Sequence, residues 1–296
     1  MTAPRVTVRV LPRLDIKGPN LVKGIHLEGL RVLGTPARFA RYYYEQGADE
    51  LLYMDAVASL YGRNSLLDIV EQTSRGIFIP LTVGGGLRTL EDVREVLRAG
   101  ADKVSLNTAV IRHPTLISEA ARRFGSSTIV VSIEAIRQPS GGYEAYTDNG
   151  REPTGVDAVE WAKRAAALGA GELLITSIDR EGAGTGFDVA LTRAIAETVS
   201  IPVIACGGAG TLHDLYEIIA HGRADAVCLA SMLHYHAISA LGEAAMTDAG
   251  EGNVEFLKSR RSFSKVQPTT LAQIKEYLTR QGIACREPAQ EPAHVD

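Results

Sequence analysis

The sequence predicts a single (β/α)₈ TIM barrel, and three observations lead to this prediction. Short β-rich segments alternate along the chain with longer amphipathic segments, as in α/β proteins. There are eight such strand segments, which is the number that closes a barrel. The chain also contains an internal repeat in which matching motifs are separated by 122 residues. A doubly wound parallel sheet is the structural alternative.

The predicted strands are short runs rich in Val, Ile and Leu, and polar residues follow most of them. Amphipathic helical segments lie between them and tend to end at a glycine, which is common at helix C-termini. The predicted strands are Val8–Leu14, Leu51–Asp55, Ile79–Val83, Lys103–Asn107, Thr128–Glu134, Leu173–Ser177, Val203–Cys206 and Ala226–Ala230. The clearest predicted helices are Leu90–Ala99, Pro114–Phe124, Ala158–Leu168 and Leu212–His221, which end next to Gly100, Gly125, Gly169 and Gly222.

The internal repeat relates the first four strand–helix units to the last four. Agreement at one offset in four separate segments is not expected by chance, so we expect a barrel built from two duplicated halves. The matching segments are 47–52 with 169–174, 79–80 with 201–202, 85–86 with 207–208, and Gly100 with Gly222.

The pattern of strands and helices loosens after the eighth strand. Residues 236–268 are predicted to form an insertion ahead of a last helix, Thr270–Arg280. The basic run Lys258–Arg261 within it is interpreted as a solvated surface, with a ligand-facing loop as the alternative. The Pro-rich, polar segment 287–296 is predicted to be a disordered tail, which leaves one barrel domain at residues 1–286.

Composition narrows the class of protein. Of the 296 residues, 45% are hydrophobic and 22% are charged, which is typical of a globular chain with a sizeable core. The net charge of −4 does not favour a nucleic-acid or membrane partner, and no segment has the pattern of a signal peptide or a membrane span. The three cysteines are widely spaced and form no metal-binding pattern. We expect a cytoplasmic protein with reduced thiols and with no metal or other cofactor.

Two glycine clusters follow predicted strands half a barrel apart. Glycine allows backbone N–H groups to approach phosphate oxygens closely, and the start of the next helix attracts an anion. The C-terminal strand ends form the ligand-binding face of such barrels, so we expect two phosphate sites across the mouth and a ligand with phosphate at both ends. One site combines Gly84, Gly85 and Gly86 with Asn107 and Thr108, and the other combines Gly207 and Gly208 with Ala230 and Ser231.

Two carboxylates lie at the ends of strands one and five, which face each other in an eight-stranded ring. Asp15 follows the first predicted strand, and Glu134 ends the fifth. General acid–base chemistry needs one protonated and one ionised group across a pocket, which this pair could supply. The alternative is that each carboxylate only pairs with a neighbouring cation, such as Lys17 or Arg137.

Four charged residues mark the starts of strands one, two, four and six, at the other end of the barrel. Inward-facing charges there must pair with one another, because an unpaired buried charge is costly. Their spacing leaves two interpretations open, a structural ion-pair plug or a gate. The four residues are Arg9, Glu50, Lys103 and Glu172.

Seven segments together resemble the cyclase subunit of imidazole glycerol phosphate synthase, from about Arg9 to Tyr235 and more weakly near 271–286. The combination is highly specific, although no single segment is. The resemblance implies a (β/α)₈ barrel that docks on a glutaminase subunit and receives ammonia through the barrel. The implied reaction, in histidine biosynthesis, converts a bisphosphorylated formimino aminoimidazole carboxamide ribotide into imidazole glycerol phosphate and aminoimidazole carboxamide ribotide. The segments are LPRLDIKG, LVKG, GADELLYMD, PLTVGGG, GADKVSLNTA, TSIDREGAGTGFD and IACGGAG.

The resemblance also implies roles for individual residues. Asp15 corresponds to the first catalytic aspartate of the family, and Lys23 to a lysine of its mobile first loop. The four charged residues at the strand starts correspond to the gate of the ammonia channel. Asp102 corresponds to a position at the glutaminase interface. At the end of strand six and in the segment after it, the residues expected to bind substrate are Thr176, Asp179 and Gly182.

Three residues depart from the family pattern. Glu134 stands where the family has its second catalytic aspartate, and a misplacement of about 1 Å can cost roughly 10²-fold in rate. Glu181 also replaces an aspartate, and Arg13 replaces a small residue. These departures suggest, as an alternative, a paralogue that uses channelled ammonia to amidate an acetamido sugar in surface-glycan biosynthesis. A barrel that only activates a glutaminase and the related ribosyl-formimino isomerase are further alternatives.

Overall fold

Eight parallel strands close into a barrel in the computed structural model, which describes residues 7–25, 28–56, 66–242 and 265–287. Strands pair with their neighbours in chain order, and β12 pairs with β1, so the ring has no open edge. This closure confirms the predicted barrel and excludes a doubly wound sheet, which has two edges. The barrel strands are β1 (Arg9–Lys17), β4 (Leu51–Asp55), β5 (Leu81–Gly84), β6 (Lys103–Leu106), β7 (Ile129–Arg137), β10 (Glu172–Ser177), β11 (Val203–Cys206) and β12 (Ala226–Leu229).

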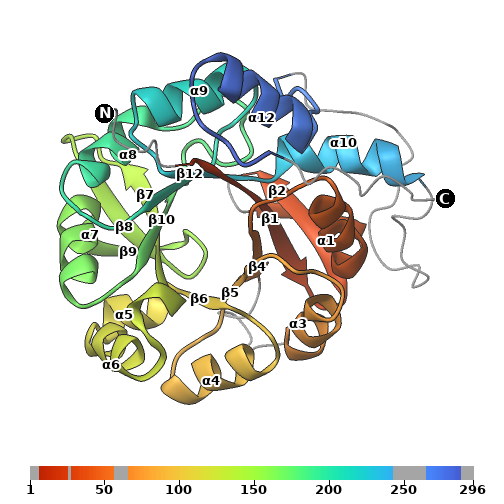
Figure 1. Ribbon diagram of the computed structural model, residues 1–296. Coiled ribbons are helices and arrows are strands. Elements are labelled where there is room, and N and C mark those ends of the chain that lie inside the picture. The colour runs from red at the N-terminus through yellow and green to blue at the C-terminus, as the bar shows by residue number, and fades with distance from the viewer. Residues whose placement is uncertain (1–6, 26–27, 57–65, 243–264, 288–296) are drawn as a thin grey trace, which may run out of the picture.

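The helices form an outer ring around these strands (Figure 1). The four clearest predicted helices and the predicted last helix are all present, and each of their ends differs from the prediction by one residue at most. They are α4 (Leu90–Arg98), α6 (Thr115–Phe124), α7 (Ala158–Ala167), α9 (Leu212–Ala220) and α12 (Leu271–Arg280). The other described helices are α1 (Pro36–Glu45), α3 (Leu67–Ser74), α5 (Thr108–Arg112), α8 (Val189–Ala196), α10 (Ser231–Leu241) and the short 3₁₀ helix η1 (Ser126–Thr128).

Two antiparallel hairpins extend the barrel at its mouth, and the sequence did not predict them. One folds back on β1 and the other on β7, so these two strands run on to Lys17 and Arg137, past their predicted ends. The hairpins therefore raise part of the barrel wall at the face where ligands bind in this fold. Their strands are β2 (Asn20–Ile25) with β3 (Glu28–Gly34), and β8 (Tyr143–Thr147) with β9 (Glu152–Asp157).

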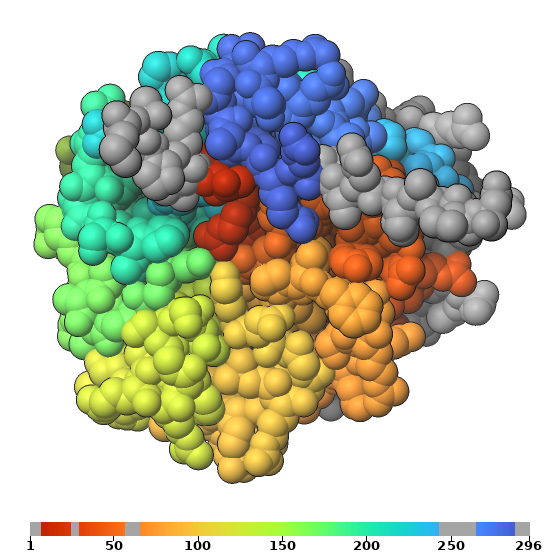
Figure 2. All heavy atoms as spheres, viewed as in Figure 1, coloured from red at the N-terminus to blue at the C-terminus, as the bar shows by residue number. Residues whose placement is uncertain are grey.

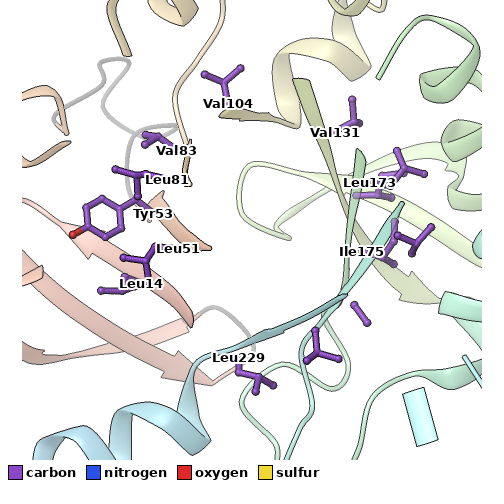
Figure 3. Close-up of a cluster of buried hydrophobic side chains, with 14 of the residues drawn as sticks. Leu14, Leu51, Tyr53, Leu81, Val83, Val104, Val131, Leu173, Ile175 and Leu229 are labelled. Atoms are coloured by element: carbon purple, nitrogen blue, oxygen red, sulfur yellow. The ribbon is translucent and has the colours of Figure 1, made fainter. Parts of the chain in front are cut away.

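Side chains alternate between two cores along the barrel strands. On β1, Val10 and Leu14 belong to the main core between strands and helices, whereas Leu11 belongs to a smaller cluster inside the barrel. Figure 3 shows residues of the main core coming from strands around the whole ring. The inner cluster fills the barrel between its two ends and comprises Leu11, Leu52, Val130, Leu174, Ile204, Cys206, Ala226 and Cys228.

The 122-residue repeat is present in the local structure of both halves. α4 begins with a capping box formed by Thr89 and Asp92, and α9 begins with the same box formed by Thr211 and Asp214. In each box the same two backbone N–H groups are satisfied, one by the threonine and one by the aspartate. The glycine pairs at 85–86 and 207–208 share positive φ angles. These equivalences support the predicted half-barrel duplication.

The C-terminal segment lies beside the start of the first strand. After α12, Cys285 forms a parallel bridge with Val8, and the N–H of Val8 donates to the carbonyl of Ala284 at 2.8 Å. Figure 2 shows this segment, in blue, next to the red start of the barrel on one end of the molecule. The segment after the last helix is therefore attached to the residue that precedes β1.

Helix α10 continues to Leu241, so the first residues of the predicted 236–268 insertion are helical. The remainder of that segment up to residue 264, including Lys258–Arg261, and the tail at 288–296 lie outside the described residues. Of the helices that are described, none is long and apolar enough to cross a membrane.

Candidate active site at the barrel mouth

Asp15 and Glu134 face each other across the mouth of the barrel. In the ring, β1 and β7 are separated by three strands on either side, which places the two residues on opposite walls as predicted. Both side chains are buried, with residue exposures of 6% and 4%. Neither residue follows a strand: Asp15 pairs with Val22 of the first hairpin, and Glu134 pairs with Tyr146 of the second.

Glu134 is buried with no ion-pair partner in the described part of the chain. Its Oε2 accepts a hydrogen bond from Nδ2 of Asn107 at 3.1 Å. Burial raises the pKa of Glu134 to about 7; Asp15 and Asp148 add to this effect, whereas Arg13 and the Gly150 backbone oppose it. A carboxyl group that titrates near neutral pH is suited to general acid–base chemistry.

Asp15 has a cation on its own strand. Nε of Arg13 donates to Oδ1 of Asp15 at 2.8 Å, and both side chains are buried. The sequence analysis suggested Lys17 as a neighbouring cation, but Lys17 is exposed at the end of β1. The two-residue period of a strand, which places residues 13 and 15 on one face, was the signal for this pair.

A cavity of about 440 Å³ opens beside the first glycine cluster. It reaches from Gly85 and Gly86, after β5, to Glu134 on β7. The predicted Gly84 does not line it; a Cβ at this residue would come within 2.6 Å of the Met54 sulfur. The wall also includes the predicted Asn107 and Thr108, and three basic residues that the sequence analysis did not single out: Arg88, Arg112 and His113. The position of Arg88, two residues after the glycine cluster, was an available signal.

The glycine turns are fixed by packing as well as by conformation. Gly85 has a φ of 93°, and a Cβ there would lie 2.6 Å from the carbonyl oxygen of Asp55. Gly208 has a φ of 109°, and a Cβ there would lie 2.2 Å from the carbonyl oxygen of Gly186. No other residue fits either position without backbone movement. Each cluster therefore forms a rigid rim.

A smaller cavity of about 20 Å³ lies over the second glycine cluster. It shares no lining residue with the first cavity, so the mouth offers two separate sites. The predicted residues Gly182, Gly207, Gly208, Ala230 and Ser231 all line it. Its wall also contains Glu181 and the thiols of Cys206 and Cys228.

Lys23, on β2, reaches the rim of this second cavity. Its Nζ donates to Oε1 of Glu181 at 2.6 Å and to the carbonyl of Gly24 at 2.9 Å. Burial would lower the pKa of Lys23, but the carboxylates of Glu181 and Asp15 outweigh burial, and the pKa is raised. The first hairpin is therefore tied across the mouth by a buried ion pair, and an anionic ligand can compete with Glu181 for the lysine.

Thr176 and Asp179 lie apart from the two cavities. Thr176 is fully buried on β10 in register with Glu134, and its hydroxyl has no hydrogen-bond partner among the described residues. Asp179 accepts a hydrogen bond from the backbone N–H of Arg137 at 2.9 Å. Thr176 therefore lies beside Glu134 below the described cavities, whereas Asp179 holds the end of β7. Neither residue lines one of the two cavities.

The four charged residues at the opposite end form a closed ring of ion pairs. Arg9 contacts Glu50 at 2.8 Å and Glu172 at 3.1 Å, and Lys103 contacts the same two carboxylates at 2.9 and 3.1 Å. The predicted pairing is confirmed. Positive and negative charges alternate around the ring. This geometry is compatible with both a plug and a gate.

Asp102 is exposed at the same end of the barrel. Its Oδ2 accepts a hydrogen bond from the N–H of Leu81, the first residue of β5, at 2.9 Å. Asp49 and Asp225 hold the starts of other strands in the same way, through Val10 and Val203. Asp102 therefore has a structural contact in the barrel itself, and its exposure leaves it accessible to a partner.

Comparison with known proteins identifies the family. Residues 9–239 match the family described as "Histidine biosynthesis protein". A Legionella pneumophila protein named imidazole glycerol phosphate synthase subunit HisF is 59% identical over 207 residues, which cover 70% of this chain and 98% of the relative. A protein of the same name from Alkaliphilus metalliredigens (strain QYMF) is 47% identical over 234 residues, covering 79% and 93% respectively. The family match spans all eight barrel strands, and the chain therefore belongs to the histidine biosynthesis protein family.

Proposed function

We propose that the chain is the cyclase subunit of imidazole glycerol phosphate synthase. Its reaction uses ammonia to convert a bisphosphorylated formimino aminoimidazole carboxamide ribotide into imidazole glycerol phosphate and aminoimidazole carboxamide ribotide, a step of histidine biosynthesis. The observation that carries this proposal is the opposed pair of buried carboxylates at a mouth with two separate glycine-rimmed cavities. Both relatives are named as subunits of this synthase.

Both glycine-rimmed sites offer groups that bind phosphate, although the smaller cavity, at about 20 Å³, has room for only about one water molecule and must widen to admit a phosphate. Each combines a glycine pair with the start of a helix, α5 or α10, and the N–H groups at a helix start attract anions. Arg88 and Arg112 add positive charge to the larger cavity, and Lys23 adds it to the smaller one. A ligand held at both ends would lie with its middle over the acid pair.

Asp15 and Glu134 are placed to exchange protons with the reacting nitrogen atoms. Ammonia becomes cationic when it adds to carbon and must lose a proton, whereas the nitrogen that leaves must gain one. Glu134, with a pKa of about 7, can hold a proton near neutral pH. The burial of both carboxylates excludes water, which strengthens their interaction with charge that develops on the substrate.

A partner subunit is the source of the ammonia in this proposal. We infer that it is a glutaminase docked at the end that carries the charged ring. Asp102 is exposed there, and Phe78, three residues before the start of β5, is 81% exposed. Exposed aromatic side chains are enriched at protein interfaces. A partner that covers both residues would seal the floor of the barrel, so that ammonia enters through the ring rather than escaping to solvent.

The comparisons do not support amidation of an acetamido sugar, since both relatives carry the name of the synthase. Glu134, which suggested that alternative, keeps a carboxylate opposite Asp15. The name of the two relatives likewise favours the synthase over the ribosyl-formimino isomerase.

A turnover assay tests the proposed function directly. The purified chain, with concentrated ammonium salt at about pH 7.5, is given the bisphosphorylated formimino ribotide, and the loss of substrate absorbance is followed. We expect turnover on the order of 1 s⁻¹, a common value for enzymes. The control omits ammonium. Binding of the ribotide without ammonium-dependent turnover would contradict the proposal.

Lys103→Met tests whether the charged ring is a gate. The substitution removes one cation from both Glu50 and Glu172, which opens the ring. In the complex with the glutaminase, we expect the ratio of glutamine-driven to ammonium-driven turnover to fall severalfold, because ammonia is no longer guided through a closed entrance. Lys163→Met, which breaks an exposed pair with Glu160 on α7, is the matched control. A ratio equal to that of the wild type would show that the ring is only a structural plug.

A further inference from the structure

Arg13 lies inside the barrel, where contacts from two strands hold its guanidinium. Nε donates to Oδ1 of Asp15 at 2.8 Å, and Nη1 donates to Sγ of Cys206 on β11 at 3.6 Å. The residue is 2% exposed. A hydrogen bond with Cys228 lowers the pKa of Cys206 and Arg13 adds to this effect, although burial opposes it. The planar guanidinium is thus fixed by two partners and cannot turn away from Asp15 without losing both contacts.

Glu134 has a different environment on the opposite wall. The groups that bond to its carboxyl are uncharged, namely the amide of Asn107 and the backbone of Gly150. The charged groups that face it are Arg13 and Asp15 from β1, and Asp148 from the turn between β8 and β9. None of the cations in the described segments lies within ion-pair distance of Glu134.

The cations near the acid pair are already paired with carboxylates other than Glu134. Arg13 pairs with Asp15, and Lys23 pairs with Glu181. Asp148, the other acid that faces Glu134, pairs with the exposed Arg112 at 2.8 Å. Ionisation of Glu134 would therefore add an uncompensated negative charge to a buried cluster, which is unfavourable. The environments of the two carboxyl groups differ, because Asp15 has a cation at contact distance and Glu134 has none in the described segments.

We propose that Arg13 is a positioning residue that fixes Asp15 as the proton acceptor, whereas Glu134, buried with no cation at contact distance, is the proton donor. The proposal rests on the proposed cyclase function. The proton lost by the adding ammonia nitrogen passes to Asp15, and the leaving nitrogen takes the proton of Glu134. These two transfers balance, with one proton accepted and one donated; the oxygen removed as the ring forms leaves as water, and proton exchange with solvent afterwards restores both groups.

Infrared difference spectroscopy of the protein without substrate tests the assignment. The C=O stretch of protonated Glu134 should disappear as the pH rises, with a midpoint at about 7, and Glu134→Gln should remove this band. In Arg13→Met the midpoint should rise by about one pH unit, because Arg13 lowers the pKa of Glu134. Arg13→Lys keeps the charge and should retain most of the wild-type midpoint. The alkaline limb of the kcat profile should move in the same direction as the band.

Two results would overturn the proposal. Loss of the band in Asp15→Asn, but not in Glu134→Gln, would place the proton on Asp15. Equal midpoints in Arg13→Met and the wild type would show that Arg13 only fills space. Thermal unfolding confirms that each variant is folded, and Arg13→Gln is the second uncharged variant if Arg13→Met does not fold. Because the titration uses no substrate, it remains decisive if the cyclisation assay fails, and the two proposals fail independently.

Discussion

Asp15→Asn is expected to lower kcat for ammonium-dependent cyclisation by about 10³-fold, the middle of the range for loss of a general acid or base. Asparagine keeps the shape of the side chain but cannot accept a proton, and Arg13 loses its carboxylate partner. KM for the ribotide should change much less, because the substrate is held mainly by its phosphates at the two cavities. Steady-state kinetics with ammonium as the nitrogen source measures both constants.

Two further variants show whether the loss comes from chemistry or from disturbance of the mouth. Glu134→Gln should cause a similar loss of kcat, although no ion pair is broken, since Glu134 has none among the described residues. Asp157→Asn is the matched control: Asp157 caps α7 by accepting from the N–H groups of Val159 and Glu160, and asparagine is an equally good cap. Its kcat should stay within about twofold of the wild type. A kcat of Asp15→Asn that also stayed in this range would exclude Asp15 as a catalytic residue.

The sequence predicted the barrel strands most closely where apolar runs are uninterrupted. The predicted bounds Leu51–Asp55 and Val203–Cys206 agree with the structure at both ends. β1 and β7 were predicted too short, because Asp15 and Glu134 break the apolar pattern although they face the barrel interior. The two hairpins were missed because their residues are mixed in polarity, and their pairing with β1 and β7 is a tertiary contact.

The candidate site could be predicted as a set of residues but only partly as a set of contacts. The period of a strand places Arg13 beside Asp15, so that pair was within reach of the sequence. Lys23 and Glu181 are 158 positions apart and meet only because the first hairpin folds across the mouth. The raised pKa of Glu134 is likewise a consequence of burial, which only the closed barrel provides.

Asp49→Ala is expected to lower the free energy of unfolding by about 3–5 kcal/mol, the usual cost of breaking a buried ion pair from one side. Oδ1 of Asp49 accepts from Lys275 at 2.7 Å and from Arg286 at 2.8 Å, and Oδ2 accepts from the N–H of Val10 at 2.8 Å. The side chain of Lys275 is only 4% exposed, so the variant would leave its ammonium with the Gly47 carbonyl and no counter-charge. The hydrogen bonds through which Asp49 connects Lys275 of α12 to Val10 of β1 would be lost.

Urea denaturation with two further variants isolates the contribution of this ion pair. Asp225→Ala removes an aspartate that holds Val203 by the same backbone hydrogen bond but pairs with no cation in the described segments, so it should cost only about 1 kcal/mol. Adding Lys275→Met to Asp49→Ala should recover much of the loss, because the unpaired charge is then absent. Equal losses at residues 49 and 225 would contradict this account. β1 carries both Arg9 at the floor and Asp15 at the mouth, so a weakened start of this strand should reduce turnover only as the barrel begins to unfold, whereas Asp15→Asn should reduce it at every temperature.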